Sequence, residues 1–324
     1  MRAETKAEER MGMVLDVSES DNIHAQAGLL DTWNQHYSQL SPGPFKGGVT
    51  SLHSPNMRFF IEQMNRSVFQ KGDVGTNRIG FGIPAKMLGK CNICGEVAEE
   101  LNLLVFSGEG GFEFLSPEDF LFFGIEIQSP PGDGLDLAVL VHRLDEHLRR
   151  ERRVIRLDKL YAANLIRLFQ SAFQVVDATQ DTTTEQARIR NMQRQFVGTV
   201  VDFLDASAPP KENSKSARNH WTVVKKIHES VIAVPDCPLS VAELSIRLNV
   251  SRRTLQNAVA NTLDMSPLGL LRALRLSEVR REIGSATSVT DIATRWGFWH
   301  FGYFARNYRA MFGELPSETL ARRR

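Results

Sequence analysis

The stretch that most constrains the fold of this chain is residues 239–257. Ser240 and Glu243 have the spacing of a capping box, in which each side chain bonds to the backbone of the other residue, so a helix is expected to begin here. Leu244 and Leu248 are one helical turn apart and share one face of that helix. A short amphipathic helix is therefore predicted at the start of the stretch.

A second helix is predicted directly after the first. Asn249 suits a tight turn because asparagine tolerates the left-handed backbone conformation. Ser251 is a favourable N-terminal cap, and Leu255 and Val259 then face inward. Four polar side chains remain on the outer face of this helix: Arg252, Arg253, Gln256 and Asn257. Two short helices joined by a tight turn, with arginines and amides outside the second, form a helix-turn-helix.

The arrangement recurs in looser form further along the chain. Thr290 and Asp291 open a short helix that breaks at Gly297, and a second helix with aromatic residues at helical spacing follows. The two helix-turn-helix units are therefore placed at residues 240–261 and 290–312. Residues 267–283 predict a connecting helix roughly 25 Å long, which is of the order of the ~34 Å that separates successive major grooves.

The residues of both units resemble a known domain. The matching segments, in chain order, are Ala242-Glu243-Leu244, Ser251-Arg252-Arg253-Thr254-Leu255-Gln256, Asp291-Ile292-Ala293, Gly297-Phe298, Tyr303-Phe304-Ala305-Arg306, Tyr308-Arg309 and Phe312-Gly313-Glu314-Leu315-Pro316-Ser317. Over about residues 220–320 the chain resembles the DNA-binding domain of the AraC/XylS family of bacterial transcription regulators. The resemblance implies sequence-specific binding to double-stranded promoter DNA.

Length and charge indicate two parts with different tasks. The 324 residues suffice for about two domains. From Lys211 onward, 18 Lys and Arg stand against 10 Asp and Glu, whereas the preceding part holds 21 against 28. A basic C-terminal part is typical of a nucleic-acid binder. The acidic N-terminal part is expected to avoid the DNA backbone.

The sequence also bears on location and cysteine chemistry. No apolar run approaches the ~20 residues that a membrane-spanning helix needs, and the apolar run within residues 1–20 is too short for the core of a secretory signal. Three cysteines, an odd number, argue against a disulfide scaffold. We expect a cytoplasmic protein with no membrane partner.

The N-terminal part is expected to begin with a mobile arm, residues 1–24, followed by a helical segment near residues 25–40. Residues 45–128 contain several short apolar or alternating runs separated by Gly, Pro, Asn and Asp, which predict a small barrel or sandwich. The family resemblance favours a small cupin-like β-barrel. Three helical patterns at 136–205 and a linker at 208–219, rich in Pro, Asn and Ser, follow.

The predicted architecture is therefore α+β. A sensing and dimerisation domain spans residues 25–207, with the three helices supplying a self-association surface. An all-α DNA-binding domain spans residues 220–324. We expect a homodimer controlled through the N-terminal domain, without a cofactor or metal, and with a small-molecule effector as a possible ligand whose binding residues the sequence does not identify. RNA polymerase is a further partner if the protein is an activator.

The second helix of each unit is the one expected to contact DNA, and these helices are called the first and second reading helices. In the first reading helix, an arginine is able to form two hydrogen bonds with guanine, and an amide is able to form two with adenine. Arg253, Gln256 and Asn257 lie where base-reading residues of the family usually lie, and Arg252 is expected to contact phosphate. The alternative is a solvated helix face, which is the default for a charged cluster. The tandem pattern favours DNA contact.

The second reading helix departs from the family pattern, because Phe301 and Gly302 stand where polar readers are common. Phe301 either touches a thymine methyl group or packs against a neighbouring ring. His300, Tyr303 and Arg306 remain as candidate DNA contacts. Whether this helix reads sequence or only positions the domain through phosphates stays open.

Two rival functions need metal ligands. A cupin-type enzyme would need a His and carboxylate set in the barrel, but residues 45–128 contain a single histidine, His53. A DNA-repair alkyl acceptor would need four clustered cysteines, whereas the chain has three. Cys91 and Cys94 form half of a zinc-site pattern, and half a ligand set does not make a tetrahedral site. The protein is therefore not expected to be an enzyme.

Overall fold

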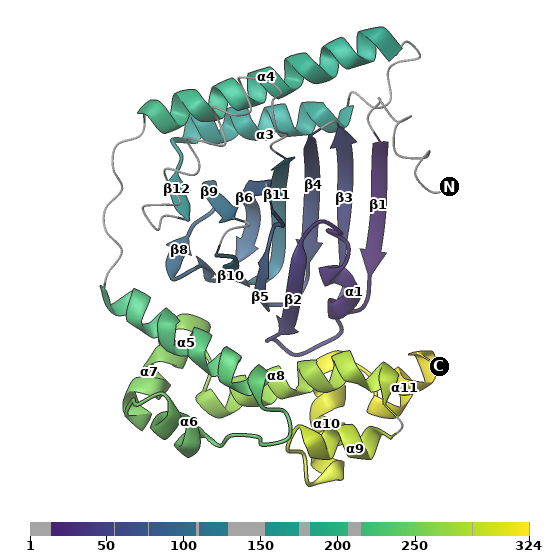
Figure 1. Cartoon of the computed structure of the whole chain (residues 1–324), viewed down its shortest axis with the longest axis vertical. Helices are drawn as coiled ribbons and strands as arrows, with labels where there is room; N and C mark the ends of the chain where they lie inside the picture. Colours follow the sequence, from purple (N-terminus) through teal and green to yellow (C-terminus); the bar gives the residue numbers. More distant parts are fainter. Residues whose placement is uncertain are drawn as a thin grey trace.

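The computed structural model describes residues 14–54, 56–76, 78–107, 110–128, 153–174, 182–206, 215–286 and 288–323. Two β-sheets form the N-terminal part, helices α3 and α4 lie on one side of them, and the C-terminal helices lie on the other (Figure 1). The chain therefore combines mixed α/β and all-helical parts. Among the described residues, no helix has both the length and the apolar character needed to cross a membrane.

The larger sheet has seven strands. Their spatial order is β1 (Val14–Ser20), β3 (Gly47–Ser54), β4 (Met57–Met64), β11 (Glu118–Gln128), β6 (Arg78–Leu88), β9 (Asn102–Ser107) and β12 (Val154–Arg156). Every neighbouring pair is antiparallel. Both faces of this sheet are covered, one by the smaller sheet and the other by α3 (Lys159–Gln174) and α4 (Thr182–Ala206).

The smaller sheet has five strands in the order β2 (Asn34–Gln39), β5 (Val68–Asp73), β10 (Phe112–Ser116), β7 (Cys91–Ile93) and β8 (Glu96–Ala98). An aromatic core lies between the sheets, where the ring centroids of Phe106 and Phe112 are 4.9 Å apart. Short helix α1 (Ile23–Ala27), whose N-cap is Asn22, closes one edge of this core.

The strands at 45–128 are not closed into the predicted barrel, and a cupin-like fold is not confirmed. They build two open sheets that face each other, and β1, β2 and β12 join them from outside that range. Alternating apolar runs indicate strands with buried faces, but they carry no information on whether the last strand bonds to the first. The sequence therefore predicted most strands and left their closure undetermined.

Three further predictions differ from the structure. Within the predicted arm, 1–24, residues 14–20 form strand β1, which pairs with β3 along its whole length. The predicted helical segment 25–40 contains only the end of α1 and then β2. The predicted linker 208–219 is shorter, because α5 (Lys215–Ala233) begins within it. Residues 1–13 of the arm, the first predicted helix after the sheets and residues 208–214 lie outside the described residues.

The C-terminal helices pack around α8. They are α5, α6 (Val241–Arg247), α7 (Arg252–Leu263), α8 (Pro267–Glu282), α9 (Val289–Arg295), α10 (Phe301–Phe312) and α11 (Pro316–Arg323), with a short 3-10 turn at Ile283–Ser285. Leu270, Leu271 and Leu274 of α8 are buried in a core shared by both helix-turn-helix units. Both predicted units are therefore confirmed as pairs of helices.

The two parts of the chain share a continuous interface. Leu40, Phe69 and Leu115 of the N-terminal part belong to the same apolar core as α5 and α8, and Phe69 stacks on Trp221 with ring centroids 5.7 Å apart. Ser277 of α8 accepts a hydrogen bond from the backbone N–H of Gln39 at 2.9 Å. The smaller sheet thus rests directly on the C-terminal helices.

Candidate nucleic-acid interface

The first helix-turn-helix unit is formed by local signals. Ser240 caps α6, and both halves of the capping box with Glu243 are present. Asn249 adopts the left-handed conformation with φ of 51°, and Ser251 caps α7 by accepting from the backbone N–H of Thr254. The hydroxyl of Ser245 donates to the carbonyl of Val250 at 2.6 Å, which ties the turn to α6. Each of these cap and turn predictions is confirmed.

The outer face of α7 carries the four predicted contact residues. Leu255, Ala258 and Val259 are fully buried, which turns the opposite face of the helix to solvent. Within the described residues, none of the four side chains has an ion-pair or hydrogen-bond partner, and all are exposed: Arg252, Arg253, Gln256 and Asn257. Their donors and acceptors are therefore free to meet an external partner.

The second unit has a longer turn. Gly297 is left-handed with φ of 83°, and a Cβ there would lie 2.6 Å from a side-chain atom of Pro238. Phe298, Trp299 and His300 separate Gly297 from α10, whereas Val250 and Ser251 alone separate Asn249 from α7. The extra residue changes how the chain enters α10, and the N-cap His300 makes no side-chain cap hydrogen bond.

The three candidate residues of the second reading helix are also accessible. His300 and Arg306 are exposed, and 66% of the Tyr303 side chain is exposed. The guanidinium carbon of Arg306 lies 5.4 Å from the ring centroid of Tyr303, so these two side chains form one patch. Phe304 and Tyr308 point into the core instead.

Helix α8 connects the two units. Ser266 caps it and Pro267 occupies its first turn, and its 16 residues give a length of about 24 Å. The guanidinium of Arg275 donates to the carbonyl of Leu239 at 2.5 Å beside the first unit. Arg280 bonds Glu314 at 2.6 Å and lies over the Phe312 ring beside the second unit. Both units are thus attached to the same rod.

The N-terminal part contacts both reading helices at their C-terminal ends. The ammonium of Lys90 donates to the carbonyl of Asn261 at 3.1 Å and to Asp264 at 2.9 Å, at the end of α7. At the end of α10, the Gly43 N–H reaches the carbonyls of Ala310 and Met311 at 3.1 and 3.0 Å. Carbonyls in the last turn of a helix lack partners within the helix, so these donors stabilise the helix ends.

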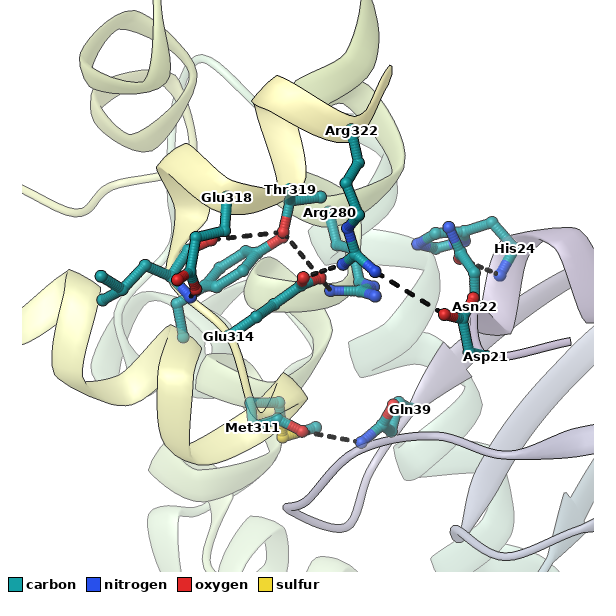
Figure 2. A network of polar contacts seen from close by, with 12 residues as sticks. Asp21, Asn22, His24, Gln39, Arg280, Met311, Glu314, Glu318, Thr319 and Arg322 are labelled. Carbon is teal, nitrogen blue, oxygen red and sulfur yellow. Dashed lines mark hydrogen bonds and ion pairs between the residues drawn. The ribbon is translucent and has the colours of Figure 1, made fainter. Parts of the chain in front are cut away.

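A polar network extends this contact on the second unit (Figure 2). Arg322 of α11 bonds Glu314 and lies 3.6 Å from Asp21 of the N-terminal part. The amide of Gln39 donates to the carbonyl of Met311 at 2.9 Å. Sequence reasoning missed these residues because no local pattern marks a contact between segments more than 200 positions apart.

The three cysteines lie in different surroundings. Cys91 is buried in β7, and Cys94 lies in the turn that follows. Burial raises the pKa of both thiols above the usual value, which disfavours the thiolate that alkyl transfer or zinc binding needs. Cys237 lies in the other domain and is exposed. Among the described residues, no group of three or more His, Cys, Asp or Glu is placed to hold a metal.

Comparison with known proteins agrees with this geometry. A family model described as a helix-turn-helix domain matches residues 244–322. The probable thc operon regulatory protein of Rhodococcus erythropolis is 39% identical over 87 residues, 26% of each chain. The XylDLEGF operon transcriptional activator 3 of Pseudomonas putida is 38% identical over 147 residues, 44% of this chain and 43% of that protein. The chain thus spans less than half the length of these two relatives.

A solved structure of a probable AraC family transcriptional regulator from Rhodopseudomonas palustris is 33% identical, with a TM-score of 0.30. The match covers 32% of this chain and 98% of the chain in that structure. The matched relatives are transcription regulators, and no enzyme family is indicated. Residues 244–322 therefore form a helix-turn-helix domain similar to that of AraC/XylS family transcription regulators.

Proposed function

We propose that this protein is a sequence-specific DNA-binding transcription regulator that reads bases chiefly through α7. The observation that carries the proposal is the free, exposed set of Arg253, Gln256 and Asn257 on the second helix of a fully capped helix-turn-helix. Such a helix enters the major groove, where arginine bonds guanine and an amide bonds adenine. Arg252 is assigned to a phosphate.

The second reading helix contributes a different set of contacts. His300, Tyr303 and Arg306 are accessible at the start of α10, and Arg306 is assigned to a phosphate. Helix α8 links α7 and α10, because both units pack on its apolar core. The two helices are proposed to enter successive major grooves on one side of the duplex.

The test of this function is selection of bound duplexes from a random pool, followed by paired affinities on the selected site and a scrambled one. Gln256→Ala is expected to lose roughly 1–3 kcal/mol on the selected site and far less on the scrambled site. Gln195→Ala, an equally exposed amide on α4, is the matched control and should change neither affinity. Absence of any selected sequence would refute the function.

Control through the N-terminal domain is the second part of the proposal. Lys90 holds the end of α7 and Gly43 holds the end of α10. A shift of the loops that carry these residues would therefore change the relative orientation of the two reading helices. This is a physical route from an effector to DNA affinity.

An interdomain pocket supports a small-molecule effector. Its volume is about 310 Å³, and it is lined by Lys90, by Leu115 of the smaller sheet and by residues 262–265 at the end of α7. A ligand there would touch the Lys90 contact directly. The test is a thermal-shift screen of small molecules against the protein and Thr262→Trp, which fills the pocket. Compounds that stabilise only the unmodified protein support the site, and equal shifts in both contradict it.

The regulator is further proposed to be a two-fold homodimer through α3 and α4, because closed two-fold pairs are the commonest oligomers. Their buried faces cover the larger sheet, so the contact must use their outer faces, where Leu160 is 64% exposed. Light scattering at micromolar concentration should give twice the chain mass of 36.5 kDa. A single-chain mass would remove the dimer and leave DNA binding intact. We also propose a cytoplasmic location, and RNA polymerase as a partner if the protein is a transcriptional activator.

A further inference from the structure

Three aromatic side chains are exposed around the start of α10. The exposed fractions are 65% for Trp299, 45% for Phe301 and 66% for Tyr303. The neighbouring Phe298 and Phe304 do not belong to this exposed group, because their rings lie 5.1 Å apart and pack in the core. Within the described residues, neither Trp299 nor Phe301 contacts another aromatic ring. Exposed apolar groups that lie together often mark a binding surface.

Gly302 separates Phe301 from Tyr303. A Cβ added at this position would meet no atom within 4 Å, and the backbone is not in the left-handed region. Glycine destabilises a helix relative to alanine, so neither packing nor backbone conformation accounts for it here. Its physical consequence is a gap in the side-chain surface, through which another molecule is able to approach the α10 backbone.

The surroundings of these aromatic groups are positively charged. Arg306 lies over Tyr303, and Arg309 is exposed one turn further along α10. In the described part of the chain, neither arginine has a carboxylate partner. An apolar surface next to unpaired guanidinium groups is complementary to a major groove, where base edges are flanked by phosphates.

The two reading helices correspond residue by residue. Each has 12 residues, begins after its N-cap and ends at a left-handed cap, Asp264 for α7 and Gly313 for α10. Phe301 and Gly302 therefore occupy the places of Arg252 and Arg253 in α7, the first assigned to a phosphate and the second to a base edge. The first turn of such a helix faces base edges. Among the major-groove edges of the four bases, only that of thymine carries a methyl group, which an aromatic ring contacts favourably.

We propose that Phe301 and Tyr303 read thymine methyl groups in the major groove, and that Gly302 lets the α10 backbone approach the base edges between them. This inference rests on the proposed DNA-binding function and assigns to the second reading helix its own sequence preference. Readout by α7 uses hydrogen bonds, whereas readout by α10 uses apolar contact.

The experiment uses the full chain and its selected duplex, in which each thymine is replaced in turn by deoxyuridine, which lacks the methyl group. One or two replacements in one half-site should weaken binding by roughly fourfold each. In Phe301→Ala the replacement at the thymine that Phe301 contacts should have no effect, and in Tyr303→Ala the same should hold for the thymine that Tyr303 contacts. The sensitivity of the other half-site stays unchanged in both variants. Leu268→Ala, which removes an exposed apolar side chain on α8, should keep the full methyl sensitivity.

A second variant separates this role from a structural one. Gly302→Ala should raise the Tm by a few degrees, because alanine favours the helix. It should also weaken binding to the selected duplex by about tenfold, the factor that 1.4 kcal/mol represents, because the added methyl blocks the approach. A raised Tm with unchanged binding would contradict the close approach.

The outcomes separate the two levels of the argument. If a sequence is selected but no deoxyuridine replacement weakens binding, or if Phe301→Ala and Tyr303→Ala both remain sensitive at every one of these positions, the thymine readout is wrong and the regulator function stands. If no sequence is selected, the proposed function fails and this inference fails with it.

Discussion

The side-chain amide of Gln39 donates a hydrogen bond to the main-chain carbonyl of Met311 at 2.9 Å, across the interface between the smaller sheet and the second reading helix (Figure 2). The same amide nitrogen also lies within hydrogen-bond distance of the carbonyls of Ser41 and Gly43, at 2.9 and 2.8 Å. Gln39 thus shapes the loop whose Gly43 N–H caps α10. One buried side chain connects the conformation of the N-terminal part to the position of a reading helix.

Gln39→Met is expected to destabilise the protein by roughly 1–3 kcal/mol. The substitution keeps the apolar volume but leaves buried carbonyls without a donor. Urea unfolding followed by fluorescence measures the free energy of unfolding. Gln195→Met on the exposed face of α4 is the control and should change it by less than about 0.5 kcal/mol. A loss no larger than that of the control would show that the interdomain hydrogen bond contributes nothing.

Loss of the N-terminal contacts at the ends of α7 and α10 should make DNA binding less dependent on the spacing between the two half-sites. Lys90→Met combined with Gln39→Met removes donors from the ends of α7 and α10. The double variant is expected to tolerate insertion or deletion of one base pair between the half-sites better than the unmodified protein does. Affinities on the three duplexes measure this tolerance. An identical spacing preference would mean that α8 alone sets the separation.

Glu62 makes stability depend on pH in the neutral range. It is buried between the sheets, accepts hydrogen bonds from Gln26 at 3.0 Å and Tyr37 at 3.2 Å, and burial raises its pKa to about 7. The folded protein therefore holds a proton that the unfolded chain releases near pH 4.5, so stability falls as pH rises from about 4.5 to 7.

Glu62→Gln should remove that slope. Relative to the unmodified protein, the variant should be more stable by roughly 3 kcal/mol at pH 8, with a much smaller gain at pH 5. The new amide also has an acceptor available, because the buried Gln26 Oε1 has no hydrogen-bond partner. Urea unfolding at both pH values gives the difference. An equal gain at both would show that Glu62 does not titrate in this range.

His228 has the opposite effect, because it makes stability fall as the pH decreases in the acidic range. It lies in the domain interface near His36, Lys71 and Glu278, and burial lowers its pKa to about 3. The unfolded chain binds this proton near pH 6.5, so stability is complete above that value and decreases as pH falls toward 3. Between pH 7 and 4.5 the loss should be roughly 2–3 kcal/mol smaller in His228→Phe than in the unmodified protein, by denaturant titration. Parallel pH profiles would contradict this assignment.

We expect Arg306 to contribute equally to the affinity for DNA of any sequence. Because a phosphate contact carries no sequence information, Arg306→Ala is expected to weaken binding to the selected and scrambled duplexes by similar factors. It should also reduce the slope of log affinity against log salt by about one unit. Titrations at several salt concentrations on both duplexes test this. A loss confined to one base position would instead assign Arg306 to a base.

The sequence by itself determined the local structure of the DNA-binding domain. The Ser240 and Glu243 capping box, the left-handed Asn249 and the Ser251 cap each depend on residues within a few positions, so short-range chemistry decides them. The outward position of Arg253 and Gln256 follows from helical periodicity once Leu255 is buried. Most strands between Gly47 and Gln128 were predicted for the same reason.

Only the tertiary structure decided how these elements meet. Strand β1 forms within the predicted arm because β3 supplies its hydrogen bonds, and the sheets stay open because strand patterns do not encode closure. The contacts from Lys90 to Asp264 and from Gln39 to Met311 join residues far apart in the chain. Such long-range pairs depend on the global packing of sheets on helices, and no window of sequence records that packing.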